Sequence, residues 1–211
     1  VYFTEEFSGH TTMLAAALLT LGLWNAAPVP RSAVMSRAMA PCMVSADVAE
    51  PKMESVSGFD FVPLLTALKT GEYREADQLT RDGLITLAGE AAVARGYVYF
   101  TEVESIPVED LSTIERLWNT YSDGKFGYSL QRKAFTAKKV NRNFELFFDR
   151  IGWKNKDGSL LRWLPEAKAD EFVYDVDKAV VGHLPLTSTL RGTQLLERLM
   201  DHPAWEAEEF N

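Results

Sequence analysis

The sequence is poor in the residues that build metal centres and disulfides. Its 211 residues include one cysteine, Cys42, and three histidines, His10, His183 and His202. A single cysteine excludes an intrachain disulfide and a multi-cysteine metal site. The three histidines do not form the HxxxH or HExxH pairs of zinc hydrolases. The sequence therefore predicts neither a metal centre nor a set of catalytic residues.

Basic residues are also scarce relative to acidic ones. Lysine and arginine together number 22 against 30 aspartate and glutamate, which gives a net charge of −8. Nucleic-acid binding depends on neutralising phosphates with many basic side chains, so a nucleic-acid partner is excluded. A small anionic ligand held by one or two arginines is still compatible, since charges are screened beyond about 8 Å at physiological salt.

The N-terminal part of the chain has no acidic residue from Phe7 to Ala46. Within it, an apolar run at 13–30 is followed by a segment with serines, small residues and two arginines at 31–46. The run has the length of a signal-peptide core and is shorter than a bilayer-spanning helix. The two parts in series resemble the leaders of algal plastid proteins. We expect residues 1–50 to be a disordered targeting leader; the alternative is an N-terminus without a targeting role.

Helix-period hydrophobic patterns fill most of the remaining chain, and strand patterns are thin. Residues 50–58 are polar and predict a linker, and the last seven residues are acidic and predict a frayed tail. We expect an all-α domain at 59–191, followed by a C-terminal helix and tail at 192–211. The expected helices are one ending near Gly71, one from Tyr73 to about Gly89, one at 109–121, a short one after Ser129, one at 138–151 and one at 193–202.

Two long segments between these helices, 89–108 and 152–190, are rich in aromatic and aliphatic residues. Loops of this length are uncommon inside a compact domain and are often functional when present. Ring-bearing loops either fold back as core or form a ligand surface. Arg150, Arg162 and Arg191 lie near the second segment. A flat apolar ligand with carboxylate groups would suit this combination, because rings pack on flat faces and guanidinium groups pair with acids.

A tight glycine turn surrounded by rings follows the best predicted helix, in "LWNTYSDGKFGYSLQ" at 117–131. Trp118 and Tyr121 lie on the apolar stripe of that helix, so we expect them in the core. Phe126 and Tyr128 follow the turn, and they line either the core or the floor of a ligand site.

The glycines of this turn, Gly124 and Gly127, permit a tight reversal and a close approach of the next helix. The residues that follow, Gln131, Arg132 and Lys133, are polar. We expect these three side chains to face solvent or a partner.

The turn motif and four further motifs resemble the genomes-uncoupled-four family. The further motifs are "GEYREADQLT" at 71–80, "IGW" at 151–153, "RWL" at 162–164 and "GHLP" at 182–185, and they occur in the family's order. Members of that family are tetrapyrrole-binding regulators of magnesium chelatase in chlorophyll synthesis. The resemblance covers about residues 59–191.

The resemblance implies an all-helical domain shaped like a cupped hand, whose palm binds protoporphyrin IX and Mg-protoporphyrin IX as ligands. It implies no enzymatic activity and no cofactor of the chain's own. The expected partner is the porphyrin-binding large subunit of magnesium chelatase, in the plastid, either in the stroma or peripherally on thylakoid or envelope membranes. The alternative is the same fold used as a docking subunit of a photosynthetic antenna or photosystem, without porphyrin exchange.

Carried over by motif, the palm consists of the segments 96–106 and 153–184. We expect nine residues to contact the ligand: Tyr97, Phe100, Ile106, Phe126, Tyr128, Trp153, Trp163, Leu184 and Arg191. The resemblance implies that Trp163 covers the macrocycle and that Arg191 meets a propionate. His183 is either a structural hydrogen-bonding group, the commoner role for a lone histidine, or an axial ligand to magnesium.

Overall fold

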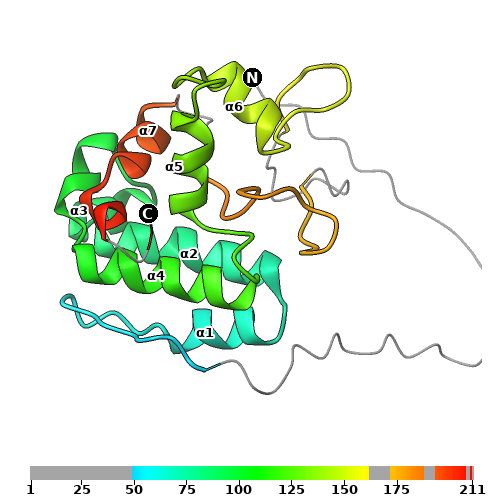
Figure 1. The fold of residues 1–211 in the computed structure, drawn as a ribbon. Helices are drawn as coiled ribbons and strands as arrows, with labels where there is room; N and C mark the ends of the chain where they lie inside the picture. Colours follow the sequence, from blue (N-terminus) through cyan, green and yellow to red (C-terminus); the bar gives the residue numbers. More distant parts are fainter. Residues whose placement is uncertain (1–48, 162–171, 188–192, 208–209, 211) are drawn as a thin grey trace, which may run out of the picture. The chain divides into compact units, whose positions relative to one another are not determined.

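Helices dominate the computed structural model, as the hydrophobic patterns predict (Figure 1). The structure describes residues 49–161, 172–187, 193–207 and 210, all within the compact unit Pro41–Asn211. These ranges contain no β-strand, only an isolated bridge between Lys154 and Leu160. The predicted all-α fold is therefore confirmed, whereas the predicted leader lies outside the described residues except for 49–50. None of the described helices has the length and apolar character needed to cross a bilayer.

The elements follow one another with short connections, apart from the long segment before the last α-helix. They are α1 (Val62–Lys69), α2 (Tyr73–Leu87), α3 (Glu90–Arg95), the 3-10 helix η1 (Phe100–Ser105), α4 (Val108–Tyr121), α5 (Tyr128–Thr136), α6 (Phe144–Arg150), α7 (Gln194–Met200) and the 3-10 helix η2 (Pro203–Glu206). In Figure 1, α1, α2 and α4 form the lower part, and α5 rises from them toward α6. The helix α7 packs against η1 and α5.

Helix α4 supplies the centre of the core. Its predicted apolar stripe is buried along its whole length: Leu111, Ile114, Leu117, Trp118 and Tyr121. The indole Nε1 of Trp118 donates a hydrogen bond to Thr80 Oγ1 on α2 at 2.9 Å, and its ring stacks on Tyr73 at 6.2 Å between centroids. The predicted core positions of Trp118 and Tyr121 are confirmed.

The glycine turn brings α5 against a carboxylate of α4. Glu115 is fully buried, and its oxygens accept hydrogen bonds from the backbone N–H groups of Tyr128 at 2.7 Å and Ser129 at 3.0 Å. The Asn119 amide donates a third bond to Glu115 at 2.9 Å. Gly127, with φ +149°, passes so close that a Cβ there would lie 2.3 Å from Glu115 Oε1. Glu115 therefore caps α5 from a neighbouring helix.

Two predicted segments differ from the structure. The helix expected at 138–151 begins only at Phe144, because Asn141 and Arg142 adopt left-handed conformations with φ +47° and +60°. The guanidinium of Arg142 pairs with Asp201 at 2.5 Å, which ties this break to the end of α7. The segment expected as one long loop at 89–108 contains α3 and η1 instead.

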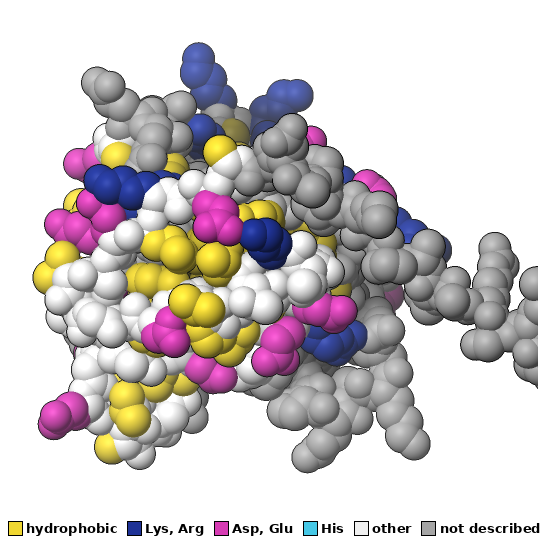
Figure 2. All heavy atoms as spheres, turned by 90° about the horizontal axis from the view of Figure 1, so that it is seen from below, with side chains coloured by type: hydrophobic (Ala, Val, Ile, Leu, Met, Phe, Trp, Pro, Cys, Tyr) yellow, Lys and Arg dark blue, Asp and Glu magenta, His cyan; other side chains and the backbone are white. Residues whose placement is uncertain are grey.

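The chain on both sides of the predicted 59–191 domain packs against it. At the N-terminal side, the buried carboxylate of Asp110 accepts hydrogen bonds from the hydroxyls of Ser55 at 2.6 Å and Ser57 at 2.8 Å. At the C-terminal side, Trp205 and Phe210 are buried in the core, so these two residues of the predicted frayed tail are packed. Figure 2 views the molecule from the side of α1, where apolar side chains lie exposed beside acidic ones.

Candidate functional site

One segment of the predicted palm, 96–106, lines a small apolar hollow. Its volume is about 20 Å³, roughly room for one water molecule. The predicted site residue Ile106 lines it, and so does Thr187, which follows the GHLP motif. The lining comes from α2, the segment 98–106, the end of the second long segment and α7: Leu84, Val98, Val103, Ile106, Thr187, Leu195 and Leu199.

The polar side chain of this lining, Thr187, lies beside a second buried hydroxyl. Thr187 is 6% exposed, and its Oγ1 and the Tyr128 hydroxyl are both buried. Burial raises the pKa of Tyr128, and hydrogen bonding to the Thr187 side chain lowers it. Apart from each other, the two hydroxyls have no hydrogen-bond partner among the described residues. The pair therefore has hydrogen-bonding capacity left for a water molecule or a ligand group that enters the hollow.

Beside the hollow, the segment 96–106 presents an accessible pair of rings. Tyr97 and Tyr99 meet edge to face at 5.2 Å between centroids, and the Tyr97 hydroxyl donates to the Tyr99 hydroxyl at 3.2 Å. The guanidinium of Arg95 lies 4.3 Å from the centroid of the Tyr99 ring and pairs with Glu102 at 2.5 Å. Tyr99 is 47% exposed. This pair offers an aromatic surface that a flat apolar ligand can contact.

The nine predicted ligand-contacting residues fall into three groups. Tyr97 and Phe100 are half-buried, and Trp163 and Arg191 lie outside the described residues. The other five are core residues with 4% exposure or less: Ile106, Phe126, Tyr128, Trp153 and Leu184. Ile106 lines the hollow. Of the predicted residues that the structure describes, Tyr97 and Phe100 are the two that remain partly accessible to a ligand. Ligand contact by these residues stays a prediction.

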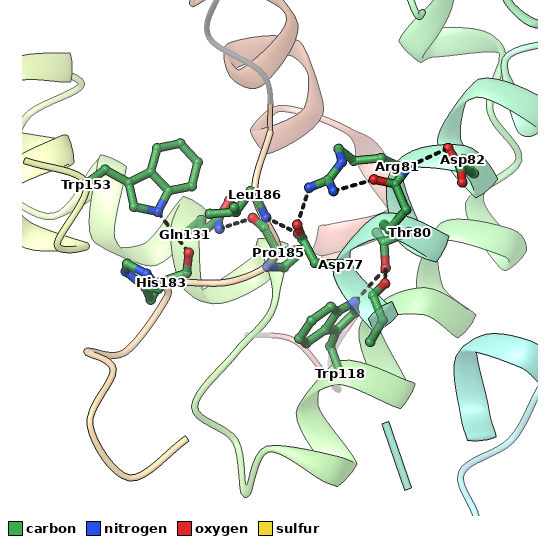
Figure 3. A network of polar contacts seen from close by, with 12 residues as sticks. Asp77, Thr80, Arg81, Asp82, Trp118, Gln131, Trp153, His183, Pro185 and Leu186 are labelled. Atoms are coloured by element: carbon green, nitrogen blue, oxygen red, sulfur yellow. Dashed lines mark hydrogen bonds and ion pairs between the residues drawn. The ribbon is translucent and has the colours of Figure 1, made fainter. Parts of the chain in front are cut away.

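Residues 182–187, which we call the strap, are held by His183 at one end. His183 Nδ1 lies 2.8 Å from the carbonyl oxygen of Ile151, and its Nε2 accepts from the backbone N–H of Val173 at 3.0 Å. The indole N–H of Trp153 donates to the His183 carbonyl at 2.8 Å, as Figure 3 shows. Both ring nitrogens are thus used within the protein, which fits the structural role and leaves neither nitrogen for magnesium.

Gly127, Gln131 and Asp77 hold the rest of the strap: the Gly127 N–H donates to the Leu184 carbonyl at 3.0 Å, and Figure 3 shows the bonds of Gln131 and Asp77. The amide of Gln131 donates to the carbonyls of Gly182 at 3.0 Å and Pro185 at 2.8 Å. Gln131 is fully buried, so the prediction that it faces solvent or a partner is wrong for this residue. Asp77 Oδ1 accepts from the Leu186 N–H at 2.7 Å.

Asp77 also pairs with Arg81, one turn further along α2. Burial raises the pKa of Asp77 to about 6, against the lowering effect of Arg81 and of the Leu186 N–H. Sequence reasoning missed Asp77, although an acidic residue on the buried face of an amphipathic helix, four residues before an arginine, could have indicated it. Among the described residues, no group of three or more acidic, cysteine or histidine side chains is arranged to hold a metal ion.

A His183→Gln variant should reveal the titration of this histidine. Burial lowers the pKa of His183 from 6.5 in the folded chain. The unfolded chain therefore takes up the proton first, and the free energy of unfolding falls as the pH drops below about 6.5. Glutamine does not titrate, so the stability advantage of the wild type over the variant should be largest near neutral pH and shrink on acidification. Urea unfolding at several pH values measures it, and a pH-independent advantage would contradict the assignment.

A model of one protein family, described as GUN4-like, matches residues 54–203 of the chain. The Tetrapyrrole-binding protein, chloroplastic, of Arabidopsis thaliana is 47% identical over 141 residues, which cover 66% of this chain and 52% of that protein. The Ycf53-like protein of Synechocystis sp. is 40% identical over 153 residues, which cover 72% and 62% of the two chains. The chain thus spans between half and two thirds of the length of these relatives.

Two solved structures resemble the fold closely. The structure of GUN4 from Chlamydomonas reinhardtii superposes with a TM-score of 0.65 at 41% sequence identity, covering 75% of this chain and 97% of that one. The ligand-free structure of Arabidopsis thaliana GUN4 gives a TM-score of 0.62 at 44% identity, covering 70% and 98%. At these identities the similarity extends to the sequence as well as to the fold.

Proposed function

Because the chain belongs to the GUN4-like family, we propose that it binds a tetrapyrrole and regulates magnesium chelatase without catalysing a reaction itself. The observation that carries the proposal is the 47% identity to an Arabidopsis protein named as tetrapyrrole-binding. That relative is named as chloroplastic, which supports a plastid location for this chain. Protoporphyrin IX and Mg-protoporphyrin IX are the proposed ligands, and the large subunit of the chelatase is the proposed partner.

The hollow and the tyrosine pair suggest how a macrocycle would lie. A hollow of about 20 Å³ is far smaller than a porphyrin and has room for about one peripheral methyl group. The flat face of the macrocycle would then extend over the segment 96–106, where Tyr99 is exposed. Burying a few hundred Å² of apolar surface at roughly 25 cal/mol per Å² gives several kcal/mol before ordering costs. One propionate–arginine pair at a wet rim adds only about 1 kcal/mol, so ring contacts should dominate affinity.

Filling the hollow tests this geometry. Val98→Phe places a ring where the peripheral group would sit, and we expect porphyrin affinity to fall about tenfold, because an overfilled apolar site forfeits about 1–3 kcal/mol. Titration of the full chain with protoporphyrin IX, followed by absorbance, measures the affinity. Val62→Phe is the matched control, since Val62 is 57% exposed on α1. Equal affinities of the two variants would refute the proposed position, and no binding by the wild type would refute the ligand class.

A second assay tests the regulatory role. Reconstituted magnesium chelatase should insert magnesium into protoporphyrin faster when the chain is added. A chain that binds porphyrin without affecting this rate would favour the alternative role as a docking subunit of a photosynthetic complex.

A further inference from the structure

Asp77 is a buried carboxylate that the proposed ligand contacts do not use. It lies on α2 with no exposed surface, among core residues. Its two oxygens have different partners: Oδ1 accepts from the Leu186 N–H at 2.7 Å, and Oδ2 pairs with Arg81. Moving a carboxylate out of water costs free energy, and an apolar residue at this position would avoid that cost. We therefore ask what the buried carboxylate of Asp77 contributes to the protein.

The Leu186 bond fixes one wall of the hollow relative to another. Leu186 is followed directly by Thr187, which lines the hollow, and α2 itself contributes Leu84 to the lining. The bond spans 109 residues of sequence and holds Leu186 against α2 (Figure 3). It fixes the backbone directly before Thr187, so it contributes to the position of Thr187 over the hollow.

We propose that Asp77 is a positioning residue for the tetrapyrrole site and that its ionisation couples ligand affinity to pH. The proposal rests on the proposed function. The ionised carboxylate accepts from the Leu186 N–H and from Arg81 at once. A protonated carboxyl is a weaker acceptor and carries no charge for Arg81, so both bonds weaken. The strap then holds Thr187 less firmly, and the ligand loses a preformed wall.

The groups that face Asp77 set the pH range of this change. Arg81 and Arg74 on α2 favour the ionised form, and burial favours the neutral form more strongly. From α5, the buried hydroxyl of Tyr128 is uncharged at neutral pH, and the strap contributes the Leu186 N–H. The resulting pKa of about 6 places the loss of affinity between about pH 7 and pH 5.

The test compares Asp77→Asn with Asp82→Asn across this range. Asparagine keeps the size of Asp77 and an oxygen for the Leu186 N–H but does not ionise. Asp82 is exposed on the same helix, and its carboxylate accepts from the half-buried Gln78 amide at 2.9 Å. Gln78 also accepts from Arg81 at 2.7 Å, so Asp82→Asn removes a nearby charge of the same network without removing the acceptor of the Leu186 N–H, which makes it the matched control. Porphyrin titrations of the full chain should show affinity falling about fivefold from neutral to acidic pH in the wild type and in the control. The Asp77→Asn variant should bind more weakly at neutral pH and lose this dependence.

The ligand's own propionates titrate equally in all three proteins, so the differences isolate Asp77. His183 titrates in all three as well. Parallel pH profiles of Asp77→Asn and the wild type would overturn the proposal. A merely structural role would lower stability and affinity without changing the profile.

Two further measurements test the role of Asp77 independently of porphyrin binding. Hydrogen-exchange protection of the Leu186 amide should fall on acidification in the wild type and not in Asp77→Asn. This measurement needs no ligand, so it tests the role of Asp77 even if no variant binds porphyrin and the proposed function fails. Should Asp77→Asn not fold, Arg81→Gln removes the cation that keeps Asp77 ionised. The pH at which affinity and Leu186 protection are lost should then move upward, and an unchanged pH would overturn the proposal.

Discussion

Replacing Gly127 by alanine is expected to lower the free energy of unfolding by about 4 kcal/mol. The backbone at Gly127 has φ +149°, a conformation that residues with a Cβ rarely adopt, and the new Cβ would lie 2.3 Å from Glu115 Oε1. The carboxylate cannot move aside cheaply, because the N–H groups of Tyr128 and Ser129 hold it. The variant therefore carries backbone strain and loses the cap of α5. Chemical denaturation of both proteins measures the difference.

Gly124→Ala is the control within the same turn. Gly124 has φ +67°, yet a Cβ there would meet nothing within 4 Å, so only the backbone cost of about 1 kcal/mol applies. A double variant with Glu115→Ala should lose less stability than the sum of its two single changes, since the truncated side chain no longer obstructs the Cβ. Equal losses for the two alanine variants of the turn would contradict the close-approach explanation.

Trp118→Ala should destabilise the protein by a similar amount, about 4 kcal/mol. The indole is fully buried between α2 and α4, packs on Tyr73 and meets Phe126 edge to face at 6.2 Å. Truncation leaves a large cavity at the centre of the core. Trp118→Phe keeps most of the ring volume and should cost about 1–2 kcal/mol, because it loses the bond to Thr80 and some packing.

Thermal and urea unfolding of these two variants give the measurement, and Val62→Ala on the exposed side of α1 serves as the control. We expect the control to change the free energy of unfolding by less than about 0.5 kcal/mol. A loss below about 1 kcal/mol for Trp118→Ala would mean that the core does not depend on this ring.

The helices were predictable because apolar residues recur at helical spacing, and α4 shows this best. Its stripe from Leu111 to Tyr121 is buried as expected. The short 3-10 helix η1 has no comparable period, so the segment 89–108 reads as a loop in the sequence. The break before α6 was not predictable either, because no sequence pattern indicates the left-handed conformations of Asn141 and Arg142.

The polar core was the part that the sequence predictions missed, and of its members only Asp77 had a local signal, its position on the buried face of α2. Glu115, Asp77 and Gln131 look like solvent-facing residues, yet each is buried with partners in distant segments. Such partners are set by tertiary structure and leave no local pattern. The rings of the long segments illustrate the same limit, since core and ligand surface both require aromatic residues. In the structure Trp153 lies in the core, whereas Tyr99 is exposed beside the hollow.

The cap that Glu115 provides has a consequence for how this corner of the protein folds. Helix α5 receives no cap from its own first residues, and the acceptor for its leading N–H groups arrives from another helix. A nine-residue helix has little tendency to form alone in water. We therefore expect α5 to be stable only when it is packed against α4, so that the two helices form together and α5 unwinds if they separate.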